Sequence, residues 1–396
     1  MTLDNTFIPY GTYWSSPFCR WQGALANDNS VVLAANTARR FLASKEIDTD
    51  SLDNLTLGMT VPQKQSFYGA PWVAGMIGAE KITGTTAAQA CATSARVLAI
   101  AAGELETGAS ECVLGVTCDR TSNGPHIVYP NPAGVGGRGD AEDWVWDNFS
   151  EDPFAGGAML QTAENVAKVA GITREEQDEI ALVRHAQYQE ALADDRAFQK
   201  RYMFPVEIGR GKRAKLVEVD EGIFPTTPEG LAKLRPAMEG GTVTFGAQTH
   251  PADGNAGMIV CTKDRAAALR KDDSVTIQVL SFGCARVDKA HMPMAVVPAA
   301  ERALQAAGIT MAQVKSVKTH NPFAVNDAYL CKQTGLGMDK LNNYGSPLIY
   351  GHPQGPTGMR VIIELIEELV IEGGGYGLFS GCAAGDTAMA MVLRVG

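Results

Sequence analysis

Apolar, strand-like runs alternate with helix-like patterns along almost the whole 396-residue chain. A helix-like stretch over 30–47 is followed by a strand-like run over 55–61, a second helix-like stretch over 93–108 and an apolar run over 111–119. Such alternation predicts an α/β fold with helical layers around mostly buried sheets. A chain of this length is also expected to form more than one domain-sized unit.

The middle of the chain breaks this alternation. Loops rich in Gly, Pro and Asn lead into a mainly helical region, in which Thr162 is a candidate helix cap and Thr173 begins a T-R-E-E capping box. Strand-like runs then resume over 274–283, 314–321 and 376–395. The pattern predicts a helical insertion that covers a layered core.

Two parts of the chain resemble each other in the order of their elements. A loop, a helix and a strand separate Cys91 from Cys118, and the same order separates His352 from Cys382. The two spacings are similar, 118 − 91 = 27 and 382 − 352 = 30 residues. We therefore expect two similar βαβ-type halves. Their predicted ranges are 1–118 with 245–270 for the first half, 119–244 for the insertion and 271–396 for the second half.

Charge and cysteine content exclude several classes of protein. The net charge of −10 and the pI near 5.2 do not suit a protein that coats nucleic acid. No apolar run approaches the roughly 20 residues of a membrane helix, and the N-terminus lacks a signal-peptide pattern. The eight cysteines form no C-x-x-C pair and no zinc-like cluster with histidine. We expect a reduced, cytoplasmic protein without a metal, a nucleic-acid partner or a membrane segment.

Four short segments combine a reactive side chain with small neighbours and follow strand-like runs or begin helix-like ones. Each residue alone is as well explained by packing or by a tight turn, since cysteine is among the most buried residue types. Loops that follow strands are, however, where layered α/β proteins place their chemistry. The segments are QACATSA around Cys91, KTHNPFAVND around His320, LIYGHPQGPTGMR around His352 and LFSGCAAGDTAMA around Cys382.

The four side chains together predict acyl chemistry. A thiol at a helix N-terminus has its pKa lowered by backbone N–H groups, and a nearby imidazole can accept its proton. We expect this for Cys91. A second thiol, Cys382, adds an acid or base on the other side of the substrate, which a hydrolase does not need. Two thiols and two imidazoles suit reversible C–C bond chemistry on thioesters.

These segments also resemble those of the thiolase family of acyl-CoA C-acyltransferases, over nearly the whole chain. SPFCRWQGAL is similar to the thiolase opening, and QACATSARVLAIAAGELETGASECVLGV is similar to the nucleophile segment. GHPQGPTG resembles the G-H-P-x-G-x-[ST]-G signature and is the most specific of these motifs. The resemblance implies the five-layered αβαβα thiolase fold, with a loop-domain insertion that binds coenzyme A.

The resemblance assigns a role to each reactive residue. Cys91 would accept the acyl group, and His352 would activate Cys91 and help to hold the thioester oxygen of the second substrate. Cys382 would move the proton on the α-carbon. The backbone N–H groups of Cys91 and Ala384 would form an oxyanion hole. His320 takes the position at which many thiolases have Asn. The sterol-carrier-linked thiolases and the ketosynthases also have His at this position.

Coenzyme A is the co-substrate that the resemblance implies. Arg210, Lys212 and Arg213, with Lys215, form a basic cluster within the insertion that is a candidate site for its ADP phosphates. A solvated basic loop explains each of these residues equally well. Thr249 replaces a residue that lies beside the pantetheine arm in many members.

Departures from the family pattern predict an unusual acyl group. The nucleophile loop reads C-A-T-S, and the last motif reads C-A-A-G-D-T-A, with Asp386 where Gly is usual. Some thiolases with His in the third segment work beside a small zinc-containing OB-fold partner, and benzoylsuccinyl-CoA thiolase is among them. A bulky or aromatic 3-oxoacyl-CoA, such a partner and a homodimeric core are therefore further expectations.

Two other functions fit parts of the sequence. A decarboxylating, ketosynthase-like condensing enzyme uses one Cys and two His, but it would leave Cys382 without a role. A non-catalytic acyl-CoA-binding scaffold would account for the altered loops around Cys91 and Cys382. Acylation of Cys91 by an acyl-CoA, followed by release to coenzyme A, distinguishes the thiolase from this scaffold.

Overall fold

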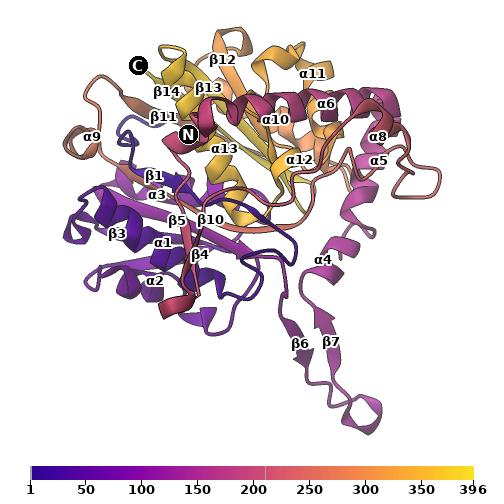
Figure 1. Ribbon diagram of the computed structural model, residues 1–396, viewed down its shortest axis with the longest axis horizontal. Coiled ribbons are helices and arrows are strands. Elements are labelled where there is room, and N and C mark those ends of the chain that lie inside the picture. The colour runs from indigo at the N-terminus through magenta and orange to yellow at the C-terminus, as the bar shows by residue number, and fades with distance from the viewer. Residues whose placement is uncertain (1, 210) are drawn as a thin grey trace.

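The computed structural model describes residues 2–209 and 211–396, in which two sheets are packed with helices between and outside them (Figure 1). The first sheet has the strand order β1-β10-β5-β3-β4, and β2 also pairs with β10. Its strands are β1 (Tyr13–Ser15), β2 (Cys19–Arg20), β3 (Asn54–Gly58), β4 (Thr83–Ala87), β5 (Cys112–Arg120) and β10 (Ala252–Cys261).

The second sheet has the order β11-β14-β13-β12. Strands β12 and β13 are parallel, whereas β14 is antiparallel to both β13 and β11. A parallel pair requires a crossover connection, and here that connection contains the helix that carries the His352 loop. The strands are β11 (Ile277–Arg286), β12 (Val314–His320), β13 (Gly375–Ala383) and β14 (Thr387–Val395).

Helices form three layers around these two sheets. Helices α1 (Ser30–Ser44) and α2 (Gly69–Ile77) cover the outer face of the first sheet, and α10 (Val296–Ala307) covers the outer face of the second. Helices α3 (Thr93–Thr107) and α13 (Gly355–Ile371) lie between the sheets and contact each other. The predicted α/β class and the five-layered order are therefore confirmed.

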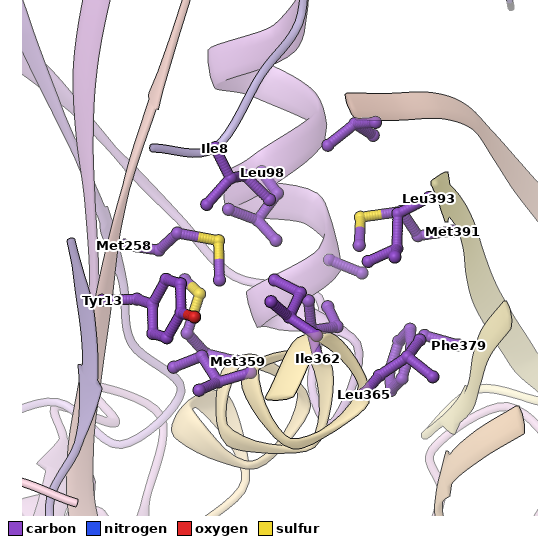
Figure 2. Close-up of a cluster of buried hydrophobic side chains, with 14 of the residues drawn as sticks. Ile8, Tyr13, Leu98, Met258, Met359, Ile362, Leu365, Phe379, Met391 and Leu393 are labelled. Atoms are coloured by element: carbon purple, nitrogen blue, oxygen red, sulfur yellow. The ribbon is translucent and has the colours of Figure 1, made fainter. Parts of the chain in front are cut away.

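The central layer is the most completely buried part of the molecule. Figure 2 shows side chains of α3 and α13, such as Leu98 and Ile362, meeting Met258 of the first sheet and Met391 of the second. Nearly every residue of α13 is buried, including the charged residues on one of its faces, where Arg360 forms ion pairs with Asp220 and Glu364.

The chain between β5 and β10 forms the region that we predicted as an insertion. It begins with a hairpin that projects away from the layers (Figure 1). A run of helices then packs beside α10 and the second sheet. Its elements are β6 (His126–Tyr129), β7 (Asp140–Asp143), α4 (Trp146–Ser150), α5 (Met159–Ala170), α6 (Arg174–Ala191), α7 (Ala193–Arg196), β8 (Val206–Ile208), β9 (Lys215–Val217) and α8 (Pro228–Ala232). The remaining helices of the chain are α9 (Lys263–Leu269), α11 (Ala324–Thr334) and α12 (Pro347–Tyr350).

One of the two predicted helix caps in this region is present. Thr173 accepts a hydrogen bond from the backbone N–H of Glu176, whose side chain accepts one from the N–H of Thr173, so the capping box is confirmed. The cap at Thr162 is wrong, because α5 begins at Met159 and Thr162 lies inside it. Met159 and Leu160 pack against the core beside α10, and this packing extends the helix upstream of Thr162.

No helix in the described part of the chain is both long enough and apolar enough to span a bilayer.

Candidate active site

Cys91 lies in the turn that joins β4 to α3. The preceding residue, Ala90, has a left-handed backbone with φ +43°, which is uncommon for a residue with a side chain. The Thr93 hydroxyl accepts a hydrogen bond from Gln89 N and donates one to Ala90 O, which holds the turn in this shape. The turn leaves Cys91 8% exposed at the wall of a cavity.

The predicted lowering of the Cys91 pKa is wrong in its net sign. Burial raises the pKa of the thiol to about 12, although the backbone N–H groups of Ala384 and Cys91 hydrogen-bond to the sulfur and lower it. The desolvation cost of a buried thiolate outweighs those two dipoles. The same two N–H groups are the ones that the family resemblance assigns to the oxyanion hole.

His352 lies in the loop before α13, where its ring is buried. Its Nδ1 is 2.7 Å from Thr357 Oγ1, and its Nε2 has no hydrogen-bond partner. A hydrogen bond from Nδ1–H to the Thr357 hydroxyl leaves Nε2 with a lone pair. Burial, with a smaller effect of His320, holds the pKa of His352 well below its ordinary value, so the ring is a neutral base.

His320 is the last residue of β12 and is fully buried. Its Nε2 bonds to the backbone carbonyl oxygen of Cys382, and its ring stacks on that of His352 with centroids 5.4 Å apart. Burial lowers the pKa of His320 to about 4. The hydrogen bond to a carbonyl requires a proton on Nε2, so the second imidazole is a neutral donor.

Cys382 lies inside β13 and is fully buried. Asn326 Nδ2, in the first turn of α11, donates to the sulfur at 3.3 Å, and His320 Nε2 is 3.9 Å from it. Burial raises the pKa of Cys382 well above its ordinary value, and the neighbouring Cys91 thiol raises it further. The thiol is therefore protonated at neutral pH.

The structure brings all four predicted side chains together. One ligand-type atom from each of Cys91, His320 and His352 lies within 4.8 Å of the others, and Cys382 adjoins His320. Among residues 2–209 and 211–396, these three form the single group of His, Cys or carboxylate side chains close enough to hold a metal ion. These three residues are also candidate catalytic residues, so their closeness does not by itself indicate a metal site. The absence of a metal stays a prediction.

A buried polar network supports the end of β12. Asp327 in α11 accepts hydrogen bonds from the Thr319 hydroxyl and from Asn321 Nδ2, and it forms an ion pair with Arg184 of α6 at 2.8 Å. All of these side chains are fully buried. Loss of one partner would leave an uncompensated charge, which typically costs about 3–5 kcal/mol. Helix α6 therefore fixes the strand that carries His320.

The cavity beside Cys91 has a volume of about 830 Å³. The segment 144–154 forms one wall, and residues 245–251, the loop after His320 and the Ala384–Gly385 turn form the others. Six of the lining side chains are aromatic. They belong to Trp144, Trp146, Phe149, Phe154, Phe245 and Phe323.

The predicted coenzyme A residues are in different places. Thr249 lines the cavity and donates to the carbonyl oxygen of Pro347 at 2.6 Å. Lys212 and Arg213 are exposed, in a short turn between β8 and β9, and do not line the cavity. Arg210 lies outside the described residues.

One departure from the family pattern does not face the acyl pocket. The Asp386 carboxylate accepts hydrogen bonds from the backbone N–H groups of Ala290 and His291, and it thereby ties the turn between β13 and β14 to the segment that follows β11. The expectation that Asp386 reshapes the pocket is therefore wrong, whereas Ala384 does line the cavity.

Three residues at the site were not singled out from the sequence. Thr357 is the [ST] position of the signature and holds His352, and Gln354 is its open x position and contacts Cys91. Motif spacing points to both. Asn326 lies six residues after His320, and only the fold of α11 brings it to Cys382.

Cys91 and His352 line the cavity, with His320 and Cys382 buried beside them, and this group of two thiols and two imidazoles in a five-layered α/β fold suits acyl transfer. Residues 14–264 match the family profile described as "Thiolase, N-terminal domain", and residues 274–395 match "Thiolase, C-terminal domain". The chain belongs to the thiolase family and is an acyltransferase.

Curated relatives and solved structures agree with this assignment. An acetyl-CoA acetyltransferase of Escherichia coli is 29% identical over 94% of this chain and 95% of its own length, and one of Syntrophomonas wolfei is 30% identical over 80% of each. The crystal structure of the Bacillus anthracis acetyl-CoA acetyltransferase has a TM-score of 0.92 at 26% identity, with 100% of both chains covered. Human mitochondrial 3-ketoacyl-CoA thiolase in complex with CoA has a TM-score of 0.91 at 26% identity, over 100% of this chain and 99% of that one.

Proposed function

We propose that this chain catalyses the reversible thiolytic cleavage of a bulky or aromatic 3-oxoacyl-CoA by coenzyme A, with the acyl group carried on Cys91. Benzoylsuccinyl-CoA is one candidate substrate. The observation that carries the proposal is the meeting of the two thiols and two imidazoles beside a large aromatic cavity.

In the cleavage direction, the Cys91 sulfur attacks the 3-oxo carbon while His352 Nε2 accepts the thiol proton. Nε2 is free for this because Thr357 occupies Nδ1. Burial raises the pKa of Cys91 and lowers that of His352, so the proton stays on sulfur in the empty enzyme and moves as the attack proceeds. The N–H groups of Cys91 and Ala384 receive the charge that develops on the oxygen.

The bond between the second and third acyl carbons then breaks, and its electron pair leaves with the departing CoA ester. Cys382 gives its proton to that carbon, a role that suits a thiol whose raised pKa keeps it protonated. Asn326 Nδ2 stabilises the thiolate that remains. His320 is assigned to the thioester oxygen, and its Nε2–H must then leave the Cys382 carbonyl.

Coenzyme A completes the cycle. Its thiol gives a proton to the Cys382 thiolate, and its sulfur attacks the acyl group on Cys91. Cys91 leaves as a thiolate and recovers its proton from His352. Every side chain returns to its starting protonation state, so the site needs no redox partner.

The cavity supports the choice of acyl group. The cavity of about 830 Å³ is lined by six aromatic side chains and has to hold both the pantetheine arm and the acyl group, so its aromatic lining rather than its volume supports the choice. Aromatic rings favour flat or bulky apolar groups through stacking and area burial. Trp146 is 66% exposed, so a large acyl group would cover apolar surface that is otherwise in contact with water.

Turnover against acetoacetyl-CoA, a medium-chain ester and an aromatic 3-oxoacyl-CoA tests the proposal. We expect kcat/KM to be highest for the aromatic ester, and the Trp146→Ala variant to raise its KM about tenfold. Trp21→Ala is the matched control, because Trp21 is 40% exposed and lies outside the cavity lining. Equal kcat/KM values for all three esters would contradict the aromatic assignment.

Coenzyme A is the proposed co-substrate, and it is bound in the structure of the human mitochondrial 3-ketoacyl-CoA thiolase that this chain resembles. Thr249 is proposed to lie beside its pantetheine arm, because it lines the cavity that leads to Cys91. The exposed pair Lys212 and Arg213 remains the proposed phosphate site. A rise in the KM for coenzyme A in a Lys212→Ala, Arg213→Ala double variant is the corresponding measurement.

A homodimer is proposed through the open edge of the first sheet. Among the described strands, β4 has β3 as its one neighbour, so its other edge offers free backbone N–H and C=O groups. Phe67 and Tyr68, at 94% and 70% exposure, precede α2, which packs on β4. Sedimentation of the purified chain measures this association.

An OB-fold partner and a cytoplasmic location stay predictions. Eight cysteines without a disulfide suit a reducing compartment. Full turnover of acetoacetyl-CoA by the purified chain alone would contradict both the partner and the aromatic substrate.

A further inference from the structure

The hydrogen bond of the nucleophile does not go to its base. The Cys91 thiol donates to Gln354 Oε1, with sulfur and oxygen 2.8 Å apart. His352 Nε2, the atom that must receive the proton, is buried and has no partner. Gln354 therefore competes with His352 for the same thiol hydrogen.

The backbone of Gln354 is held in an unfavourable conformation. Its φ of +61° with ψ of −99° is rare for a residue with a side chain and costs on the order of 1–3 kcal/mol. The next residue, Gly355, is fixed because its N–H donates to the buried Asp119 carboxylate at 2.8 Å. Asp119 also accepts hydrogen bonds from the N–H groups of Thr60 and Val61, so the loop is tied to the cavity wall. The surrounding structure thus holds the strained residue beside the nucleophile.

The position of Gln354 makes its contact sensitive to substrate. Gln354 and Cys91 both line the cavity, so an acyl group that reaches the sulfur must pass the amide. The family signature leaves this position open, as the x of G-H-P-x-G, and thus assigns it no role. An aliphatic side chain here would leave the thiol without this acceptor.

We propose that Gln354 is a positioning residue that holds the Cys91 thiol hydrogen in the empty enzyme and releases it to His352 when an acyl-CoA enters. On release, the S–H···O bond to the amide breaks, and the proton passes from the Cys91 sulfur to His352 Nε2 during attack. The inference rests on the proposed function for the identity of the entering ligand. The hydrogen bond between the Cys91 thiol and the Gln354 amide, which we call the hold, exists without that ligand.

The alkylation rate of Cys91 by iodoacetamide tests the hold in the enzyme without substrate. Gln354→Leu keeps a side chain of similar size and removes the acceptor, so we expect Cys91 to react up to about tenfold faster at pH 7, as the loss of one hydrogen bond predicts. Gln354→Glu keeps an acceptor and adds negative charge, so we expect slower alkylation than in the unsubstituted chain. Mass spectrometry of the Cys91 peptide gives each rate.

A control separates this effect from altered access. Gln305→Leu makes the same substitution on the exposed face of α10 and should leave the rate unchanged. Altered access would not produce opposite changes in the Leu and Glu variants, which have similar volumes. Equal rates in both variants, or slower alkylation of Gln354→Leu with an unchanged pH profile, would overturn the proposal. Circular dichroism checks that both variants fold.

The test also separates this inference from the proposed function. Faster alkylation of Gln354→Leu in a chain that cleaves none of the 3-oxoacyl-CoA esters would keep the hold and reject the substrate assignment. Aromatic turnover combined with unchanged alkylation would do the reverse. In an active enzyme, preincubation with a non-cleavable acyl-CoA should abolish the difference between the unsubstituted chain and Gln354→Leu. Cys91 should then be alkylated at the same rate in both.

Discussion

The two thiols of the site lie close together but in opposite kinds of structure. Cys91 lies in a turn with a left-handed residue beside a cavity, and it donates a hydrogen bond to the Gln354 amide and accepts hydrogen bonds from backbone N–H groups. Cys382 lies within a regular strand, with no exposure and with Asn326 and His320 against its sulfur. Both have raised pKa values, because burial dominates at each position.

This difference separates two chemical tasks. A nucleophile must reach a carbon atom of varying size and shape, which requires an open side. A proton carrier must meet one atom of the bound ester and keep its proton away from water until then. Position, more than pKa, distinguishes the two thiols.

The largest expected effect is that of Cys91→Ala. Without the acyl acceptor we expect turnover to fall by about 10⁴-fold or more, since loss of a nucleophile removes the covalent route. No acyl group should be found on the protein after incubation with an acyl-CoA. Acylation of another cysteine in this variant would show that Cys91 is not the one thiol able to carry the acyl group, and the contrast between Cys91 and Cys382 would fail. Such acylation, with unimpaired turnover, would remove Cys91 from its proposed role.

Cys382→Ala should separate the two tasks. We expect cleavage and condensation to fall by about 10²–10⁴-fold, because proton transfer is lost. Acylation of Cys91 should persist and be reversed by added coenzyme A. Full condensation activity in this variant would instead favour the decarboxylating, ketosynthase-like reaction, in which Cys382 has no task.

The smallest effect is the pH dependence of alkylation in the enzyme without substrate. Because burial raises the pKa of Cys91 to about 12, its thiolate fraction should grow about tenfold per pH unit between pH 7 and 9. Cys382 should stay unmodified over this range while the chain is folded. A rate that levels off near pH 7 would show that Cys91 is a low-pKa thiol after all.

The sequence predicted the fold well because the layers leave direct marks on it. Buried strands such as β5 and β14 appear as largely apolar runs in the sequence. The four reactive residues were found because each lies at the end of an element or in a short motif beside small residues. Their convergence also required the two sheets to pack together, because Cys91 follows β4 of the first sheet whereas His320 and Cys382 lie near the ends of β12 and β13 of the second.

Local sequence could not give the electrostatic balance at the site. The helix N-terminus near Cys91 is visible in the sequence, but the depth of burial that outweighs it depends on packing between the sheets. The orientation of the Asp386 side chain could not be predicted either, because its hydrogen-bond donors are residues 290 and 291, far from it in sequence. The contact of Gln354 with Cys91 joins positions 263 residues apart.

Cys91 follows a strand of the first sheet, whereas His320 and Cys382 come from the second sheet and His352 from the loop before α13. A chain that ends before this later portion would therefore lack the imidazole that is proposed to accept the Cys91 proton. The complete site forms only when both sheets are present and packed together.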